Sequence, residues 1–176
     1  GAWREAREEG PVVGEANGLA AGKEVVMGQD RHEAKEGATG MLHHGQFGTA
    51  GHEIVIEEML VGQEASILAI VDRDTIIPLA TSQDHKRAND GDQGLNTGGM
   101  GAYSPTPVVT DKMMYEIIQR ILVPTVHDMK VQSCPFSGVL YARLMLTQRG
   151  PMLLKFNVRF VHPAIQPSLL RFRSDL

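Results

Sequence analysis

The feature that most constrains the fold of this chain is a series of short apolar runs rich in β-branched residues and separated by turn residues. These runs are Ile54–Ile56, Ile67–Val71, Thr75–Leu79, Phe136–Leu146 and Met152–Val158. Runs of this length between Gly, Asp and Asn clusters are typical of β-strands. The Arg73-Asp74 turn is short enough for the strands on either side of it to form a hairpin. The sequence therefore predicts antiparallel sheet.

Helical segments lie between these runs. Trp3–Glu9 predicts the end of a helix before Gly10-Pro11, and Asp30 predicts the start of a helix that runs to about His44, because Glu33 completes a capping box. Asp111 is expected to cap a helix to about Met129, which has apolar residues at helical spacing. A last helix is expected to begin at Pro167. Shorter strands are expected at Pro11–Val13 and Val25–Met27.

This order of elements contains hairpins as well as crossovers, so it predicts an α+β fold rather than a regular βαβ repeat. We expect two lobes, a small one at residues 1–52 and a larger one at residues 53–176. Both ends of the sequence lie next to or inside predicted helices, so we expect the chain to be part of a longer protein.

Charge and cysteine content exclude several classes of partner. Lys and Arg number 17 and Asp and Glu 21, which gives a net charge of −4 and no overall field that would attract nucleic acid or an anionic membrane. No apolar run approaches the roughly 20 residues that span a bilayer. The single cysteine, Cys134, rules out an internal disulfide framework and is consistent with a reducing compartment. We therefore expect a cytoplasmic protein that binds neither nucleic acid nor membranes.

Glycine is abundant, with 19 residues in 176, and this excess predicts several tight loops. The first is Gly18-Leu-Ala-Ala-Gly22-Lys23, where backbone N–H groups and a lysine could hold a phosphate. It is not a Walker loop, because no Ser or Thr follows the lysine. A tight turn beside a solvated lysine is the alternative.

A second candidate is the polar, glycine-rich stretch from Ser82 to Pro107, which we expect to be a long functional loop. The adjacent residues His85, Lys86 and Arg87 could clamp an anion. Further along the same stretch, Thr97, Gly98, Gly99 and Gly101 could present backbone N–H groups as an anion nest. A surface hinge loop is the alternative.

Two further groups of polar residues lie on predicted strands. Glu57, Glu58 and Glu64 could accept hydrogen bonds from a ribose hydroxyl or an exocyclic amine, or could simply be solvated. Lys155, Asn157 and Arg159 alternate along a strand, so they could hold a metal–phosphate from one face or form an exposed sheet face. The seven histidines and the single cysteine show no zinc-site spacing.

Taken together, these segments resemble the phosphoribosylamine–glycine ligases (glycinamide ribonucleotide synthetases), an ATP-grasp family of purine biosynthesis. The resemblance covers nearly the whole chain in order. The residues that carry it include Gly18–Lys23, Ile54-Val-Ile-Glu-Glu58, Gln83-Asp-His-Lys-Arg87, Asn96-Thr-Gly-Gly-Met-Gly-Ala-Tyr103, Gly138-Val-Leu-Tyr-Ala142 and Phe156-Asn157. The family fold implied is ATP-grasp, with two lobes of mixed or antiparallel sheet that enclose a nucleotide cleft.

The resemblance also implies an activity and site residues. The family joins glycine to 5-phosphoribosylamine through glycyl phosphate, converts ATP to ADP and phosphate, and uses Mg²⁺ or Mn²⁺; we expect a monomer. By position, the cofactor-binding residues are Gly18, Gly22, Lys23, Glu57, Glu58 and Glu64, and the substrate side is His85, Lys86, Arg87, Thr97, Gly98, Gly99 and Gly101. Asn157 matches a metal ligand, and Arg159 matches a catalytic arginine beside the reacting phosphate.

Several residues depart from the family pattern. Glu15 replaces a nucleotide-binding lysine, Lys155 replaces a metal-binding glutamate, Arg143 replaces a glycine, and Val161-His-Pro-Ala164 lacks two further carboxylates. A lysine repels Mg²⁺, which needs hard oxygen ligands. The chain is therefore either the ATP-binding fragment of the ligase, truncated at both ends relative to the family, or a non-catalytic ATP-grasp-like module. We also hypothesise that Glu15 and Lys155 pair with each other.

Overall fold

The computed structural model describes residues 12–16, 25–28, 30–43, 53–91 and 93–173. The chain divides into two compact units, Gly1–Leu60 and Val61–Leu176, which are treated separately below. The predicted helix at 3–9, the glycine loop at 18–23 and the side chain of Glu15 lie outside the described residues. The hypothesis that Glu15 pairs with Lys155 therefore stays a prediction.

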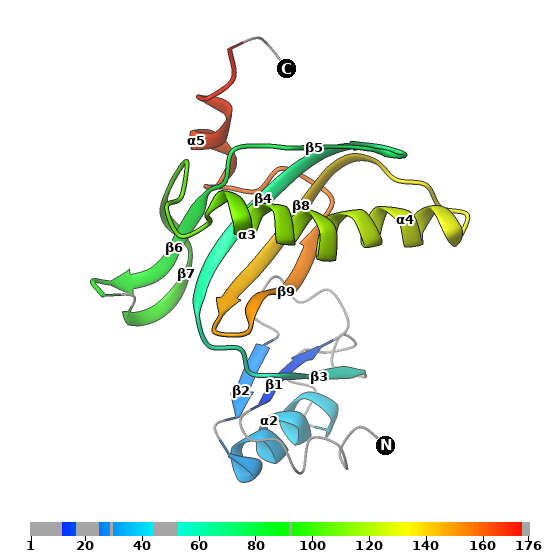
Figure 1. Ribbon diagram of the computed structural model, residues 1–176. Coiled ribbons are helices and arrows are strands. Elements are labelled where there is room, and N and C mark those ends of the chain that lie inside the picture. Colours follow the sequence, from blue (N-terminus) through cyan, green and yellow to red (C-terminus); the bar gives the residue numbers. More distant parts are fainter. Residues whose placement is uncertain (1–11, 17–24, 29, 44–52, 92, 174–176) are drawn as a thin grey trace. The chain divides into compact units, whose positions relative to one another are not determined.

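In the described part of the first unit, helix α2 packs on a three-stranded antiparallel sheet (Figure 1). Its strands are β1 (Val12–Ala16), β2 (Val25–Gly28) and β3 (Ile54–Glu58), in the order β2-β1-β3. Helix α2 (Arg31–His43) begins where the sequence predicts, because Asp30 Oδ1 accepts hydrogen bonds from the backbone N–H groups of His32 (2.8 Å) and Glu33 (2.9 Å). Ala38 and Met41 of α2 are buried.

Strand β3 belongs to the first unit, whereas the expected boundary at 52/53 assigned it to the second. The reason is its pairing: β3 runs antiparallel to β1 along its whole length, from Ala16 opposite Ile54 to Val12 opposite Glu58. Backbone hydrogen bonds of this kind hold a strand to its sheet irrespective of chain order. The division between the compact units accordingly follows Leu60.

The second unit is built on a four-stranded antiparallel sheet in the order β5-β4-β8-β9. The strands are β4 (Gln63–Asp72), β5 (Thr75–Pro78), β8 (Ser137–Thr147) and β9 (Gly150–Asn157). The hairpin predicted around Arg73-Asp74 is confirmed by the β4–β5 pairing. Alternate residues of β4 and β8 form one buried face, namely Ile67, Ala69, Val71, Leu140, Ala142 and Leu144. The α+β prediction is correct.

A long helical segment covers this apolar face (Figure 1). It consists of α3 (Asp111–Ile117), a π-helical turn η2 (Ile118–Leu122) and α4 (Val123–Val131). Its N-cap is Thr110, whose hydroxyl accepts from the N–H of Met113 at 3.3 Å, and not Asp111 as predicted. The π turn ends two residues before Pro124, whose ring and missing N–H disturb regular α-helical hydrogen bonding. None of the described helices is both long and apolar enough to cross a lipid bilayer.

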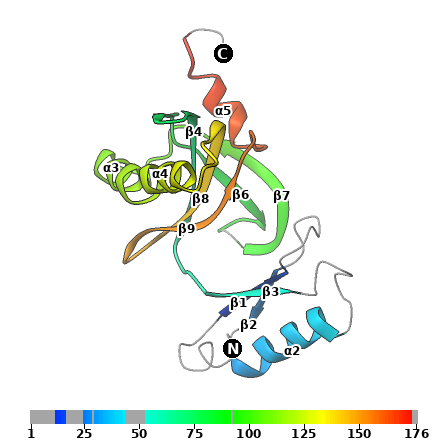
Figure 2. The same cartoon turned by 90° about the vertical axis from the view of Figure 1, so that its right-hand side faces the viewer.

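The stretch expected to be a long loop is instead a β-hairpin, and that part of the prediction is wrong. Strands β6 (Gln83–Asn89) and β7 (Gln93–Tyr103) pair antiparallel with two register shifts. The polar, glycine-rich composition of this stretch gives no sign of strands. The hairpin is held by backbone pairing, and an isolated bridge joins Ser82, just before it, to Ser66. Figure 2 shows this hairpin on the side of the four-stranded sheet opposite α3 and α4.

The last helix, α5 (Ile165–Leu169), begins before Pro167 rather than at it. Proline is tolerated in the first turn of a helix, where its missing N–H has no partner to lose. Helix α5 contributes Ile165 to a smaller apolar cluster with Leu68, Leu79 and Tyr141.

Candidate functional site

The sheet face opposite α3 and α4 carries polar residues in register. Ser66 of β4 lies opposite Arg143 of β8, which lies opposite Lys155 of β9. Two residues before Arg143 on β8, Tyr141 lies opposite Asn157 of β9. Residues directly opposite each other in an antiparallel sheet share a face, as do residues two positions apart on one strand. We call this set the polar face: Glu64, Ser66, Tyr141, Arg143, Lys155 and Asn157.

Arg143 and Glu64 form a bidentate ion pair in the middle of the polar face. Arg143 Nε donates to Glu64 Oε2 at 2.9 Å, and Arg143 Nη2 donates to Glu64 Oε1 at 2.7 Å. Both side chains are largely buried, with 22% and 33% of their surfaces exposed. The planar guanidinium matches the two oxygens of a carboxylate, which makes this geometry one of the stronger hydrogen-bonded pairs in proteins.

Strand β6 adds two more charges to this pair. Lys86 Nζ lies 3.7 Å from Glu64 Oε2 and 3.6 Å from Asp84 Oδ2. The Asp84 side chain is only 4% exposed, and its Oδ1 atom accepts no hydrogen bond from the residues that the structure describes. We call Glu64, Asp84, Lys86 and Arg143 the charged cluster. It links the hairpin to the four-stranded sheet.

The charged cluster shifts the pKa values of its members in opposite directions. Burial alone would raise the pKa of Glu64, but the hydrogen bonds and charge of Arg143, helped by Lys86, outweigh it and hold that pKa below its ordinary value. Burial raises the pKa of Asp84, and the nearby Lys86 only partly opposes this. Burial and the charge of Arg143 lower the pKa of Lys86, although the carboxylates of Glu64 and Asp84 act to raise it.

A neutral hydrogen bond continues the polar face beside the cluster. The hydroxyls of Ser66 and Tyr141 lie 2.9 Å apart, and both residues are buried. Burial raises the pKa of Tyr141, so its hydroxyl stays protonated. The pair ties β4 to β8 and fixes the two strands between which Glu64 and Arg143 meet.

The structure does not bring His85, Lys86 and Arg87 together as a clamp. Successive side chains alternate along a strand, and each of the three contacts a different part of the hairpin region. His85 stacks on Tyr103 with ring centroids 5.6 Å apart, while Arg87 Nη1 donates to the carbonyl of Gly94 at 2.8 Å. Only Lys86 reaches the charged cluster.

The expected nest from Thr97 to Gly101 is part of strand β7. The N–H of Gly99 donates to Thr97 Oγ1 at 3.1 Å, and that hydroxyl donates to the carbonyl of Lys86 at 2.8 Å. Gly99 has a φ of +128°, and a Cβ there would lie 2.6 Å from Pro163 Cδ and 3.1 Å from Asp84 Oδ1. The glycine therefore lets β7 approach the buried carboxylate closely.

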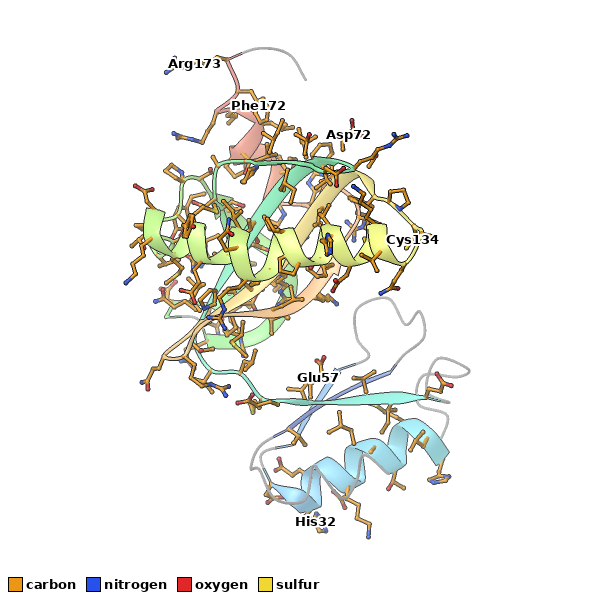
Figure 3. The ribbon with its side chains drawn as sticks, turned by 45° about the vertical axis from the view of Figure 1, so that its right-hand side comes forward. His32, Glu57, Asp72, Cys134, Phe172 and Arg173 are labelled. Atoms are coloured by element: carbon orange, nitrogen blue, oxygen red, sulfur yellow. The ribbon has the colours of Figure 1, made fainter. Side chains whose placement is uncertain are left out.

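The remaining predicted site residues that the structure describes lie on β3 and at or after the end of β9. Glu57 and Glu58 are exposed neighbours on β3, so their side chains point to opposite faces of that strand. Figure 3 shows Glu57 on the face of the three-stranded sheet that lies away from α2. Asn157 ends β9 and is half-buried, and Arg159 follows the strand, where its Nη1 donates to the carbonyl of Phe160 at 3.2 Å. Gly18, Gly22 and Lys23 lie outside the described residues.

Two residues of the charged cluster, Asp84 and Arg143, were not predicted from the sequence. The sequence presents Asp84 only as part of the Gln83–Arg87 block, and Arg143 only as a departure from the family pattern. A usable signal is present, because Tyr141 and Arg143 on one strand and Glu64 and Ser66 on another interrupt apolar runs at a spacing of two. Which polar residues would face each other depended on the strand register.

The donor set on the polar face does not fit Mg²⁺. No group of three His, Cys, Asp or Glu residues that could hold a metal ion occurs in the part of the chain that the structure describes. Lys155 and Arg143 are directly opposite each other beside Asn157, so a cation there would meet two positive charges, one amide oxygen and a single carboxylate, that of Glu64, which Arg143 already holds. Mg²⁺ requires near-octahedral oxygen coordination, usually with carboxylates. The described residues of the polar face therefore do not form a Mg²⁺ site.

Comparison with known proteins places these features in a family. Residues 3–165 match the family described as "Phosphoribosylglycinamide synthetase, ATP-grasp (A) domain". The chain is 54% identical over 165 residues to phosphoribosylamine–glycine ligase from Rhodopirellula baltica. The matched segment covers 94% of this chain and 38% of that protein. It is 51% identical over 172 residues to the ligase from Escherichia coli strain K12, covering 97% of this chain and 40% of that protein. It thus spans about two fifths of these relatives.

Solved structures agree with this assignment. The crystal structure of phosphoribosylamine–glycine ligase from Thermotoga maritima matches with a TM-score of 0.78 at 33% identity, over 92% of this chain and 41% of that one. The biotin carboxylase domain of 2-oxoglutarate carboxylase from Hydrogenobacter thermophilus matches with a TM-score of 0.63 at 14% identity, over 92% of this chain and 34% of that one, which concerns the fold alone. The chain therefore belongs to the family of phosphoribosylglycinamide synthetase ATP-grasp domains.

Proposed function

We propose that this chain is the ATP-binding part of a phosphoribosylamine–glycine ligase of purine biosynthesis. The observation that carries the proposal is that relatives named for this activity are 49–54% identical to the chain over 94–97% of its length. The reaction joins glycine to 5-phosphoribosylamine. We also propose, on the same family resemblance, that the protein acts as a monomer in the cytoplasm.

The proposed chemistry has two steps. The glycine carboxylate attacks the γ-phosphorus of ATP, which forms glycyl phosphate and releases ADP. The amine of phosphoribosylamine then attacks the acyl carbon, the C–N bond forms, and phosphate leaves. Catalysis of this kind depends chiefly on positioning the reactants and on neutralising negative charge.

On the nucleotide side, we propose roles for the glycine loop and for three glutamates. Gly18, Gly22 and Lys23 would cover the phosphates, while Glu57 and Glu58 would lie along the adenine edge, one through its side chain and the other through its backbone, because their side chains point to opposite faces of β3. Glu64 would accept a ribose hydroxyl, and it retains the capacity to do so because a carboxylate has about four acceptor sites and Arg143 uses two.

On the substrate side, we propose that the hairpin residues line the site for glycine and phosphoribosylamine. These are His85, Lys86, Arg87, Thr97, Gly98, Gly99 and Gly101, with Arg159 beside the reacting phosphate. What supports the proposal is that Lys86 lies at the edge of the polar face and that Arg159 is exposed at the end of β9.

A thermal-shift titration tests nucleotide binding. ATP at about 100 times its dissociation constant should stabilise the folded state by about 2.7 kcal/mol, which is readily measured. GTP should give a smaller shift at the same concentration, because Glu57 and Glu58 are proposed to select the adenine edge. Equal shifts with ATP and GTP, or no shift with either at millimolar concentration, would contradict the proposal.

A matched pair of variants makes this test specific. Glu57→Gln on β3 should weaken ATP binding, whereas Glu53→Gln, which is also exposed and lies just before the same strand, should bind like the unchanged chain. Both substitutions remove one negative charge, so a difference between them reports position rather than net charge. Identical ATP affinities for the two variants would argue against the adenine-edge role.

A further inference from the structure

The ammonium group of Lys86 lies midway between two carboxylates. Its Nζ atom is 3.7 Å from Glu64 Oε2 and 3.6 Å from Asp84 Oδ2, and both distances exceed the roughly 2.7–2.9 Å of a charge-assisted hydrogen bond. The backbone of Lys86 is fixed, because Thr97 Oγ1 donates to its carbonyl at 2.8 Å. Its side chain is a flexible four-carbon stem. The two carboxylates therefore decide where the ammonium group lies.

Glu64 has few acceptor sites to spare for a ligand. A carboxylate offers about four, and the guanidinium of Arg143 occupies one on each oxygen. A movement of about 1 Å would bring Lys86 Nζ to hydrogen-bond distance from Glu64 Oε2. The ammonium group would then compete with a ligand hydroxyl for the remaining sites on Glu64. A second attraction on Lys86 prevents this movement.

Asp84 supplies that second attraction from a fixed position. Its side chain is 4% exposed, and a Cβ on Gly99 would lie 3.1 Å from Asp84 Oδ1 and 2.6 Å from Pro163 Cδ, so β7 and Pro163 enclose the carboxylate closely. Asp84 Oδ1 has no hydrogen-bond partner among the described residues. Burying a carboxylate oxygen in this state costs stability. The contact of Asp84 Oδ2 with Lys86 gives a reason for keeping such a group.

We propose that Asp84 is a positioning residue of the nucleotide site: it draws Lys86 away from Glu64 and so leaves Glu64 able to accept a ribose hydroxyl. Among the residues that the structure describes, Glu64 and Asp84 are the carboxylates that pair with Lys86. The charge of Arg143 repels Lys86, but two hydrogen bonds fix Arg143 on Glu64. The inference rests on the proposed role of Glu64 in nucleotide binding and adds the residue that preserves this role.

Calorimetric titration of the full chain with two nucleotides tests the proposal. The probes are ATP and 2′,3′-dideoxy-ATP, both in MgCl₂, and the ratio of their affinities measures what the ribose hydroxyls contribute. The unchanged chain should prefer ATP by at least about tenfold, because a hydrogen bond to a charged group is lost in the dideoxy compound. Asp84→Asn should reduce this preference to less than about threefold, because Lys86 then closes on Glu64. An undiminished preference in Asp84→Asn would overturn the proposal.

A second substitution separates positioning from a structural role. In the double variant Asp84→Asn/Lys86→Met the ammonium group is gone, so Glu64 is again available and the preference for ATP should return. A general structural defect would not be repaired by removing another side chain. The control is Asp74→Asn, which takes the same charge from the Asp74–Lys130 pair (2.7 Å) and should keep the preference within about twofold of the unchanged chain. Failure of the rescue, or an equal loss in the control, would refute the proposal.

The nucleotide proposal and the positioning proposal fail in different ways. If ATP is preferred over GTP but Asp84→Asn leaves the preference over dideoxy-ATP unchanged, the first stands and the second fails. If ATP does not bind, the first fails, and a double-mutant cycle in urea unfolding tests the second without nucleotide. The coupling between Lys86→Met and Glu64→Gln should then be larger in the Asp84→Asn background than in the unchanged chain. Equal coupling would contradict the positioning role. Circular dichroism of each variant verifies that it folds.

Discussion

Arg143 puts a full positive charge in the middle of a strand whose neighbouring residues, Ala142 and Leu144, are fully buried. The residue is tolerated because Glu64 accepts two hydrogen bonds from its guanidinium. The departure from the family pattern at this position is thus accommodated by a specific ion pair. At the scale of single residues, this pair is the most informative feature of the site.

A double-mutant cycle measures the strength of this pair. Arg143→Met and Glu64→Gln should show a coupling free energy of about 1–3 kcal/mol in urea unfolding, since hydrogen bonds to largely buried charged groups are among the stronger ones. The control is the more exposed Arg120–Glu116 pair one helical turn apart on the helical segment, where the same substitutions should couple by less than about 0.5 kcal/mol. Equal coupling in the two cycles would show that the Arg143 pair is an ordinary surface contact.

The pH dependence of stability should follow from the opposite pKa shifts of Glu64 and Asp84. The folded-state pKa of Glu64 is lowered, so the stability it contributes is complete above its unfolded-state pKa of about 4.3 and is lost as pH falls through the lower folded value. The destabilisation caused by Glu64→Gln should therefore be larger at about pH 7 than at about pH 3. Chemical unfolding at both pH values checks this.

Asp84 should show the reverse trend. Its folded-state pKa is raised, so the charged form costs stability at neutral pH, and this cost disappears as pH falls through the raised value. The free energy of unfolding of Asp84→Asn, relative to that of the unchanged chain, should therefore be higher at neutral pH than in acid. If both variants lose stability in the same direction with pH, the charged cluster does not have the protonation pattern described above.

At the scale of elements, the β6–β7 hairpin depends on a close approach at Gly99. Gly99→Ala should destabilise the protein by roughly 1–3 kcal/mol, because the residue has a φ of +128° and a Cβ would collide with Pro163 Cδ at 2.6 Å. Gly101→Ala is the matched control on the same strand, since no atom lies within 4 Å of the position that its new methyl group would take. Thermal unfolding of both variants tests this, and similar losses would refute the role of Gly99.

The elements themselves were predictable to different degrees. The strands from Ile54 onward and the start of α2 follow from local patterns, since β-branched runs and the Asp30 cap act over a few residues. The β6–β7 hairpin could not be predicted from local patterns, because backbone groups of a polar stretch make its pairing. It also depends on the bridge between Ser66 and Ser82 and on the close approach of Gly99 to Pro163. Local composition carries little information about such pairing.

At the scale of the whole molecule, the two compact units have separate buried residues. Met41→Ala removes a side chain that is 1% exposed in the first unit and should cost about 2–5 kcal/mol. We expect hydrogen exchange to accelerate in α2 and β1–β3 but not in β4 and β8. Leu144→Ala, a fully buried change in the second unit, should give the opposite pattern. Acceleration of both units by either variant would show that they unfold as one.

The sequence by itself determined the α+β fold and the resemblance to an ATP-grasp family, because both follow from residue identity and short-range spacing. Only the tertiary structure decided that Arg143 meets Glu64, that Lys86 lies beside Glu64, and that Arg143 and Lys155 are opposite each other on neighbouring strands. The physical reason is strand register. A shift of one residue turns every side chain of a strand to the other face, and the register is set by pairing between segments far apart in the chain.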